Sequence, residues 1–248
     1  MSDFPIRIGL IGAGYIATWH ADAIAATTGI SLSAVCDLSL DQAQGLAQAY
    51  GARAFGSIDD LIAADICDAV HILTPPDLHR DLAIQCLQAG LHVLVEKPVA
   101  LSAAQTQDIE DAAQRAGRRF HAGHNFLGLP AYQRLKTELT RGALGRVSSA
   151  EIRWNFPLPP LRSGPYALWL LRQPQNLLLE LGPHLAGFAT DLFGPLEIEH
   201  VSLGKPIDMP GGDPRPQSWR ILARAGDVDV TFVLSLVETV DDRSMTLY

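Results

Sequence analysis

The chain has 248 residues, 48% hydrophobic and 19% charged, a composition that supports a sizeable buried core and excludes a disordered protein. Its formal net charge of -8 and the lack of a basic cluster argue against a nucleic-acid-binding surface. No apolar run reaches the roughly 18 residues of a membrane span, and the N-terminus has no basic leader. The cysteines, Cys36, Cys67 and Cys86, have no metal-ligand spacing. We therefore expect a cytoplasmic protein without a metal site, in which the cysteines are core residues.

Residues 1–121 alternate short apolar strand patterns with helix patterns. The predicted strands are Arg7–Ile11, Leu32–Cys36, Ala69–Leu73, His92–Val95 and Phe120–Gly123. Continuous apolarity is typical of parallel strands that are covered on both faces. Ser39 and Ser102, each with a glutamine three residues later, have the spacing of a capping box, and Ser57 with Asp60 is a weaker version. The pattern predicts an α/β domain with a doubly wound parallel sheet.

The pattern changes after about residue 125. Helices are predicted at 130–141 and about 177–193, and strands at 146–156, 196–203, 218–223 and 228–237, with a short piece at 244–248. Turns such as Ala225-Gly226-Asp227 between strands favour an antiparallel sheet. We therefore predict two domains: residues 1–121, which bind a nucleotide, and residues 122–248, an α+β domain with an open, mainly antiparallel sheet for substrate binding and oligomerisation.

A glycine-rich segment, Gly12-Ala13-Gly14-Tyr15-Ile16-Ala17, follows the first apolar strand and opens a helix pattern. This is the context that a dinucleotide-binding turn requires. Gly12 permits the tight turn, Gly14 lets the backbone approach a pyrophosphate, and Ala17 keeps the helix close to the strand. The helix N-terminus offers N–H groups and a positive dipole end to the phosphates. A tight turn without a ligand is the alternative interpretation.

Asp37 ends the second predicted strand, 25 residues after Gly12. An acidic residue there accepts hydrogen bonds from both ribose hydroxyls of NAD and would repel the 2′-phosphate of NADP. No arginine follows directly to neutralise that phosphate; the next residues are Leu38 and Ser39. The sequence therefore predicts NAD, with NADP less favoured. An acid just before Ser39 could instead favour the N-terminus of the next helix.

Two further segments follow strands whose carboxyl ends would form a ligand crevice. The first, Thr74-Pro75-Pro76-Asp77-Leu78-His79, is a stiff loop, in which His79 by itself could be a surface or capping residue. The second, Glu96-Lys97-Pro98, ends a core strand with two opposite charges and a fixed backbone. A lysine beside a nicotinamide could hydrogen-bond a substrate hydroxyl and favour its ionised form. A structural Glu–Lys surface pair is the competing interpretation.

The sequence resembles the Gfo/Idh/MocA family of NAD(P)-dependent oxidoreductases, the glucose–fructose oxidoreductase and inositol dehydrogenase type. The resemblance rests on the motifs GAGYIA with His20, TPPDLH, AGLHVLVEKPVA, AGHNFLGLPAY and ELGPHLAGFATDLFG. It implies a Rossmann domain followed by an open antiparallel sheet, and hydride transfer at a C–OH group of a sugar, cyclitol or similar polyol. By the same resemblance, Lys97 orients the substrate hydroxyl and His184 is the general acid/base. Glu180, where the family usually has aspartate, is a second proton-relay or substrate ligand.

The matching motifs also imply a set of cofactor contacts. These are Gly12, Gly14, Tyr15, Ile16, Asp37, Thr74, Pro75, His79, Glu96, Lys97 and Asn125. The chain departs from the family at Gln175-Asn176, where two glycines are usual, at Gly187 instead of aspartate, and at Phe126-Leu127 instead of an arginine. These departures remove polar groups from the expected substrate pocket. The chain also ends earlier than family members do.

We expect an NAD-dependent oxidoreductase, and two alternatives remain: a non-catalytic NAD-binding sensor or regulatory protein on the same scaffold, and a degenerate copy with neither role. Glu180 and His184 are four residues apart, so one helix face would present both. His184, after Gly182-Pro183, could also simply lie near a helix break. We further expect a homo-oligomer, a dimer or tetramer, formed through the second-domain sheet, because the strand at 228–237 offers apolar residues to both of its faces. One face would carry Val228, Val230, Phe232, Leu234 and Leu236, and the other Thr231, Val233, Ser235 and Val237.

Overall fold

The computed structural model describes residues 5–210 and 212–248. The chain divides into two compact units between Gly123 and His124, whereas the sequence pattern placed the boundary after residue 121. Within the described residues, no helix has both the length and the apolarity needed to cross a membrane.

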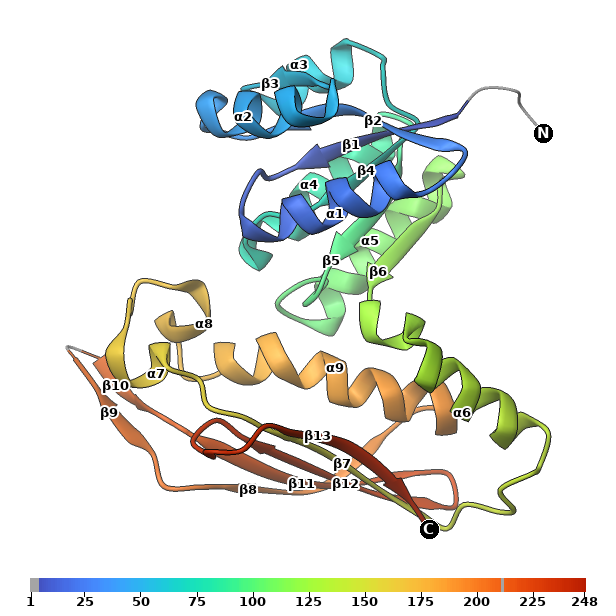
Figure 1. Ribbon diagram of the computed structural model, residues 1–248, viewed down its shortest axis with the longest axis vertical. Helices are drawn as coiled ribbons and strands as arrows, with labels where there is room; N and C mark the ends of the chain where they lie inside the picture. The colour runs from blue at the N-terminus through green and yellow to red at the C-terminus, as the bar shows by residue number, and fades with distance from the viewer. Residues whose placement is uncertain (1–4, 211) are drawn as a thin grey trace. The chain divides into compact units, whose positions relative to one another are not determined.

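The first unit is an α/β structure with one parallel sheet (Figure 1). Its strands are β1 (Ile6–Ile11), β2 (Ile30–Cys36), β3 (Arg53–Phe55), β4 (Ala69–Ile72), β5 (His92–Glu96) and β6 (Phe120–Gly123). Its helices are α1 (Tyr15–Ala26), α2 (Leu40–Tyr50), α3 (Ile58–Ala63), the 3-10 turn η1 (Pro76–Leu78), α4 (His79–Gln88) and α5 (Ala103–Ala116). The strand order β3-β2-β1-β4-β5-β6 is that of a Rossmann fold and confirms the predicted doubly wound sheet.

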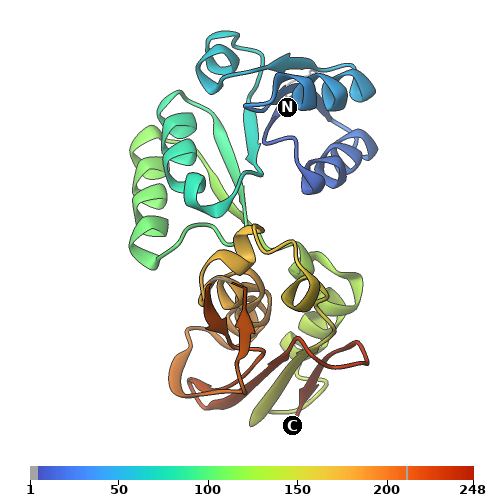
Figure 2. The ribbon, with the colours of Figure 1, turned by 90° about the vertical axis from the view of Figure 1, so that its left-hand side faces the viewer.

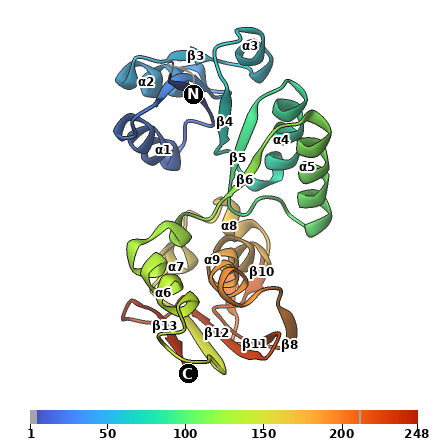
Figure 3. The ribbon, with the colours of Figure 1, turned by 90° about the vertical axis from the view of Figure 1, so that its right-hand side faces the viewer.

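Helices cover both faces of this sheet. Figures 2 and 3 show α1 and α2 on one face and α3, α4 and α5 on the other. The buried residues follow this division, since Leu10 packs with α1 while its neighbour Ile11 belongs to the cluster that contains α4 and α5. This two-sided burial is why the strands of the first unit are apolar at consecutive positions.

The helix starts agree only in part with the predicted caps. Ser102 Oγ accepts the Gln105 N–H at 3.3 Å, and Ser57 Oγ accepts the Asp60 N–H at 3.1 Å, so these two serines cap α5 and α3. Ser39 stands at the N-cap of α2, but its side chain accepts no helix N–H, so the predicted cap was wrong. The local hydrogen bond at this turn is made by Asp37, whose Oδ1 accepts the Ser39 N–H at 2.8 Å.

The second unit contains a five-stranded sheet and a two-stranded ribbon. Its strands are β7 (Ser149–Asn155), β8 (Glu197–Leu203), β9 (Ile207–Met209), β10 (Gly212–Arg215), β11 (Ser218–Ala225), β12 (Val228–Ser235) and β13 (Asp242–Leu247). Its helical segments are η2 (Asn125–Gly128), α6 (Pro130–Thr140), α7 (Pro160–Ser163), α8 (Trp169–Arg172) and α9 (Asn176–Phe193). The order is β13-β7-β12-β11-β8, in which β7 and β12 are parallel and the other neighbours antiparallel. The predicted antiparallel sheet is therefore a mixed, mostly antiparallel one.

The long helix α9 lies along one face of this sheet (Figure 1). Its buried residues Leu185 and Phe188 share a core with Ile152 of β7 and Phe232 of β12. The helix runs through Pro183 without a break, so the alternative placement of His184 beside a helix break is not observed.

The opposite face of the sheet is more polar than the sequence suggested. The strand register places these residues side by side on it: Glu151 and Arg153 of β7, Thr231 and Val233 of β12, and Arg220 and Leu222 of β11. Arg153 Nη2 lies 2.6 Å from Glu151 Oε1. The expectation of several large apolar residues on this face was wrong, because Val233 and Leu222 lie among charged and hydroxyl side chains.

Candidate active site

The glycine-rich turn follows β1, where the order of the parallel strands reverses between β1 and β4. Gly12 has φ +101°, and a Cβ there would lie 2.9 Å from the Leu73 carbonyl carbon. A Cβ on Gly14 would meet nothing within 4 Å. The fold therefore requires glycine at position 12. Position 14 keeps the surface open at the N-terminus of α1, which has no side-chain cap and fits a pyrophosphate.

Asp37 lies against this turn. Its Oδ2 accepts the Ala13 N–H at 2.8 Å, while Oδ1 accepts the Ser39 N–H at 2.8 Å. Each carboxylate oxygen has a second lone-pair direction, so the group can still accept hydrogen bonds from ribose hydroxyls. The contact with Ser39 also links Asp37 to the start of α2, which was the alternative interpretation.

His79 was predicted to contact the cofactor directly, but its side chain is buried between two loops. It is 1% exposed, and its Nδ1 and Nε2 lie 2.9 Å from Pro98 O and 2.7 Å from Thr74 O. Burial lowers the pKa of His79 below its ordinary value, although both carbonyl groups oppose this effect. His79 thus joins the loop after β4 to the loop after β5. Thr74 Oγ1 is buried and has no hydrogen-bond partner in the described part of the chain.

Glu96 is the centre of a polar cluster at the end of β5. Its Oε1 lies 3.1 Å from His20 Nε2, and its Oε2 accepts the Lys97 N–H at 3.0 Å. His20 Nδ1 lies 3.0 Å from His71 Nδ1 of β4. Sequence reasoning missed His71, although a histidine inside an otherwise apolar strand is a usable signal. The structure thus brings Glu96, Lys97 and the motif residue His20 together.

His184 and Glu180 lie on α9, one turn apart. His184 is 8% exposed. Its ring stacks on Trp154, with centroids 5.1 Å apart and an interplanar angle of 24°, and meets Phe126 edge to face at 4.7 Å. Phe126 is part of the segment in which the family usually has an arginine. Aromatic rings thus fix the position of His184 and shield it from water.

The remaining departures from the family pattern have structural counterparts. Asn176 is buried, and its Nδ2 donates to Trp169 O at 2.7 Å, which ties α8 to the start of α9. A Cβ on Gly187 would lie 3.4 Å from His124 Nδ1, so the small residue at 187 leaves room for this histidine. Asn125, a predicted cofactor contact, is exposed at the start of η2.

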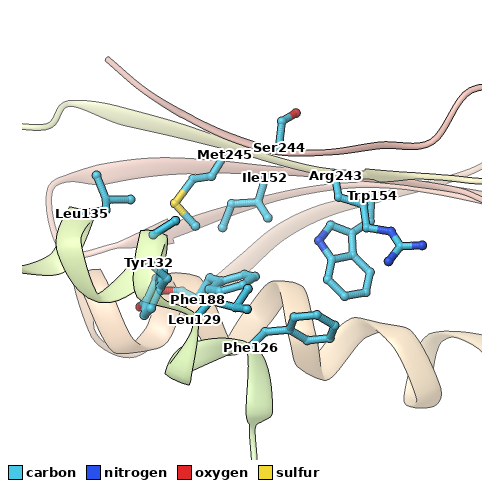
Figure 4. Close-up of a pocket in the computed structure, with 11 residues that line it drawn as sticks. Phe126, Leu129, Tyr132, Leu135, Ile152, Trp154, Phe188, Arg243, Ser244 and Met245 are labelled. Atoms are coloured by element: carbon cyan, nitrogen blue, oxygen red, sulfur yellow. The ribbon is translucent and has the colours of Figure 1, made fainter.

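An apolar pocket of about 320 Å³ lies beside the rings that contact His184 (Figure 4). It is lined by Phe126, Leu129, Ala131, Tyr132, Leu135, Ile152, Trp154, Phe188, Arg243, Ser244 and Met245. The Arg243 guanidinium lies 5.5 Å from the centroid of the Trp154 ring. Sequence reasoning missed this pocket because its walls come from η2, α6, α9, β7 and β13, which are distant in the chain.

The strand order, the glycine-rich turn and the acid at the end of β2 define the first unit as a dinucleotide-binding domain of the oxidoreductase type. Residues 6–124 match the Gfo/Idh/MocA family, described as an oxidoreductase family with an NAD-binding Rossmann fold. This match over residues 6–124 confirms the resemblance seen in the sequence.

Named relatives match a part of the chain. Glucose-6-phosphate 3-dehydrogenase of Bacillus subtilis (strain 168) is 31% identical over 148 residues, which are 60% of this chain and 42% of the relative. D-glucoside 3-dehydrogenase of Escherichia coli (strain K12) is 33% identical over 150 residues, 59% of this chain and 42% of the relative. The matched part of the chain thus spans less than half the length of these relatives.

The same fold occurs in solved structures. The WlbA dehydrogenase from Bordetella pertussis, crystallised with NADH and UDP-GlcNAcA, matches all of this chain and 72% of its own with a TM-score of 0.86. Its sequence identity is 24%, so the likeness shows a shared fold.

Proposed function

We propose that this chain is an NAD-dependent oxidoreductase that transfers hydride between the nicotinamide and a C–OH group of a sugar, cyclitol or similar polyol. The observation that supports this most is the end of β5, where the Glu96 carboxylate is hydrogen-bonded to His20 and to the Lys97 N–H. Parallel strands end at one edge of their sheet, so Lys97 emerges at the edge that carries the glycine-rich turn. When bound, NAD supplies the hydride acceptor or donor.

Groups other than the cofactor have to bind the substrate hydroxyl and transfer its proton. We assign Lys97 to donate a hydrogen bond to the substrate oxygen and favour its ionised form, and His184 to take or give the proton. Glu180 is one turn before His184 on α9 and serves as a second relay or substrate ligand. The rings of Trp154 and Phe126 support the role of His184, because they hold its imidazole in one place.

Turnover tests the catalytic assignment. A panel of polyols and aldoses is followed at the NADH absorbance band. Lys97→Ala and His184→Ala should each lower turnover by about 10²- to 10⁴-fold and leave NAD binding nearly intact. Lys205→Ala and His200→Ala, at exposed positions of the same residue types, are the matched controls. If the parent binds NAD but turns over no substrate, the sensor alternative replaces this proposal.

Asp37 supports NAD over NADP. Titration calorimetry of the parent should give tighter binding of NAD, and Asp37→Ala should narrow the difference between the two nucleotides. Asp41→Ala, an exposed acid in the first turn of α2, is the control and should leave the preference unchanged. Equal or better binding of NADP by the parent would show that the assignment of Asp37 is wrong.

We also propose a cytoplasmic homo-oligomer, a dimer or tetramer, assembled through the sheet of the second unit. The unbonded, buried cysteines support a reducing compartment. The strand β8 supports assembly, since Ile198, Val201 and Leu203 are 57%, 46% and 57% exposed. Light scattering on the eluted protein tests the oligomer, and a single mass near 26.8 kDa would contradict it.

A further inference from the structure

Three side chains from separate elements of the first unit form a continuous chain, here called the His71–His20–Glu96 chain. His71 lies on β4, His20 on α1 and Glu96 on β5. The two imidazoles meet edge to face, with centroids 5.1 Å apart and Nδ1 atoms 3.0 Å apart. The far end of the chain is Glu96 Oε2, which accepts the Lys97 N–H at 3.0 Å. The chain therefore ends on the main chain of the lysine.

Hydrogen-bond chemistry fixes the direction of this chain. Burial raises the pKa of Glu96, but the hydrogen bonds from the His20 side chain and the Lys97 N–H oppose this effect, and the pKa lies below its ordinary value. A carboxylate only accepts, so His20 donates from Nε2. A neutral His20 then accepts at Nδ1, and His71 has to donate from its own Nδ1. Burial lowers the pKa of His71 to about 4, which keeps this imidazole neutral.

The carboxylate also lies close to Gly123 of β6. A Cβ on Gly123 of β6 would lie 3.1 Å from Glu96 Oε1 and 3.2 Å from Glu96 Cα. The side chains of His20 and Glu96 are 16% and 13% exposed, so little water competes for their hydrogen bond. Glu96 is therefore held by hydrogen bonds to His20 and to the Lys97 N–H, next to a position of β6 where only glycine leaves it room.

We propose that His20 is a positioning residue: through Glu96 it fixes the main chain at Lys97, and His71 selects the tautomer of His20 that can do so. The proposal rests on the proposed function, in which Lys97 contacts the substrate. Because His20 lies on α1, whose first residue follows the glycine-rich turn, the same contacts tie the nucleotide-binding helix to the lysine.

The proposal has a spectroscopic signature. In this arrangement, His20 carries its proton on Nε2 and His71 carries its proton on Nδ1. The two rings therefore have opposite tautomers.

Long-range proton–nitrogen NMR of the full chain labelled with ¹⁵N-histidine reads these tautomers directly. The expected result at neutral pH is an Nδ1–H tautomer for His71 and an Nε2–H tautomer for His20. An Nε2–H tautomer for His71, or an Nδ1–H tautomer for His20, would overturn the assignment. This measurement uses the parent protein and does not depend on any variant folding.

Two substitutions then separate positioning from packing. His20→Ala removes the donor to Glu96, whereas His20→Gln keeps an amide donor at a similar reach. His20→Ala should shift the Lys97 amide resonance, His20→Gln should restore most of it, and the control His200→Ala should leave it unchanged. A Lys97 amide that does not respond to His20→Ala overturns the proposal, whether or not a substrate has been found.

Activity gives the functional readout. On a substrate from the polyol panel, His20→Ala should lower kcat by about 10²-fold, the effect of a small misplacement of a reacting group, with KM and NAD affinity near the parental values. An unchanged kcat would overturn the positioning role and leave the oxidoreductase assignment standing. A parent without turnover counts against the proposed function alone, and the Lys97 amide then decides the role of His20.

Discussion

The two units hold His20 and His184 in different ways. In the first unit, His20 lies between a carboxylate and a second imidazole, with both ring nitrogens at hydrogen-bond distance. In the second unit, His184 is stacked on Trp154 and meets the edge of Phe126. Hydrogen bonds define which nitrogen carries the proton, whereas ring contacts define where the imidazole lies and exclude water. The first arrangement suits a residue that orients its neighbours, and the second suits one that exchanges a proton.

Replacing Trp154 tests the ring-packed half of this comparison. Trp154 is 6% exposed and belongs to the core of the second unit. Trp154→Ala should lower the free energy of unfolding by about 3–5 kcal/mol, because a large buried ring leaves a cavity. Urea denaturation measures the loss, and Trp154→Phe should keep most of the stability. If Trp154→Ala is nearly neutral, ring packing is not what holds this region together.

The glycine-rich turn tests a contact of the first unit that depends on the backbone and not on packed rings. Gly12→Ala should lower stability by about 2–3 kcal/mol, because its φ of +101° disfavours a side chain and the Cβ would meet the Leu73 carbonyl. Gly14→Ala has open space and should fold like the parent, but should bind NAD more weakly. Thermal unfolding and calorimetry separate the two effects. Equal stability of both variants would contradict the assigned roles.

Tyr132 tests whether a polar contact also matters in the second unit. Its hydroxyl donates to Asp191 Oδ2 at 2.7 Å, and Lys136 binds the same carboxylate. Tyr132→Phe should lower stability by about 1.5 kcal/mol, the lower end for hydrogen bonds to charged groups. Tyr50→Phe, which loses an exposed hydrogen bond to Asp22, is the control and should cost less.

The pH dependence of the Tyr132→Phe loss has a defined sign. Hydrogen bonds from Lys136 and then Tyr132 hold the pKa of Asp191 below its ordinary value. A carboxylate whose pKa is depressed by folding stabilises the protein above its unfolded pKa of about 3.9 and loses this contribution as the pH falls through the folded value. The difference between parent and variant should be full at pH 7 and shrink below about pH 4. A difference that grows on acidification would contradict the role of Asp191.

The smallest expected effect concerns two serines of the first unit. Ser57 caps α3 through the Asp60 N–H, whereas the Ser39 side chain makes no cap. Ser57→Ala should therefore cost about 1 kcal/mol, and Ser39→Ala should be close to neutral. Chemical denaturation of both variants measures the difference. The reverse order would show that spacing in the sequence is a better guide to these caps than the hydrogen bonds are.

The sequence predicted the regular parts of both units because periodicity and turn residues act over a few positions. It missed β3, α7, α8, β9 and β10, each of which has only three or four residues and shows no period. The Gly12 turn and Asp37 were predicted together, since their spacing is typical of one fold. The approach of His20, His71 and Glu96 was not predicted, because the outer two of these three positions are 76 residues apart. The polarity of the open sheet face was predicted wrongly for the same reason. The strand register brings its residues together from parts of the sequence that are far apart.

Pro183 within α9 has a consequence for the chemistry beside His184. Proline has no N–H, so the carbonyl oxygen of Leu179 receives no helical hydrogen bond from residue 183. That oxygen is a main-chain acceptor next to Glu180 in sequence, and no side-chain substitution at position 179 removes it. The helix thus carries, one turn before Pro183, a main-chain acceptor that has no charge and does not titrate.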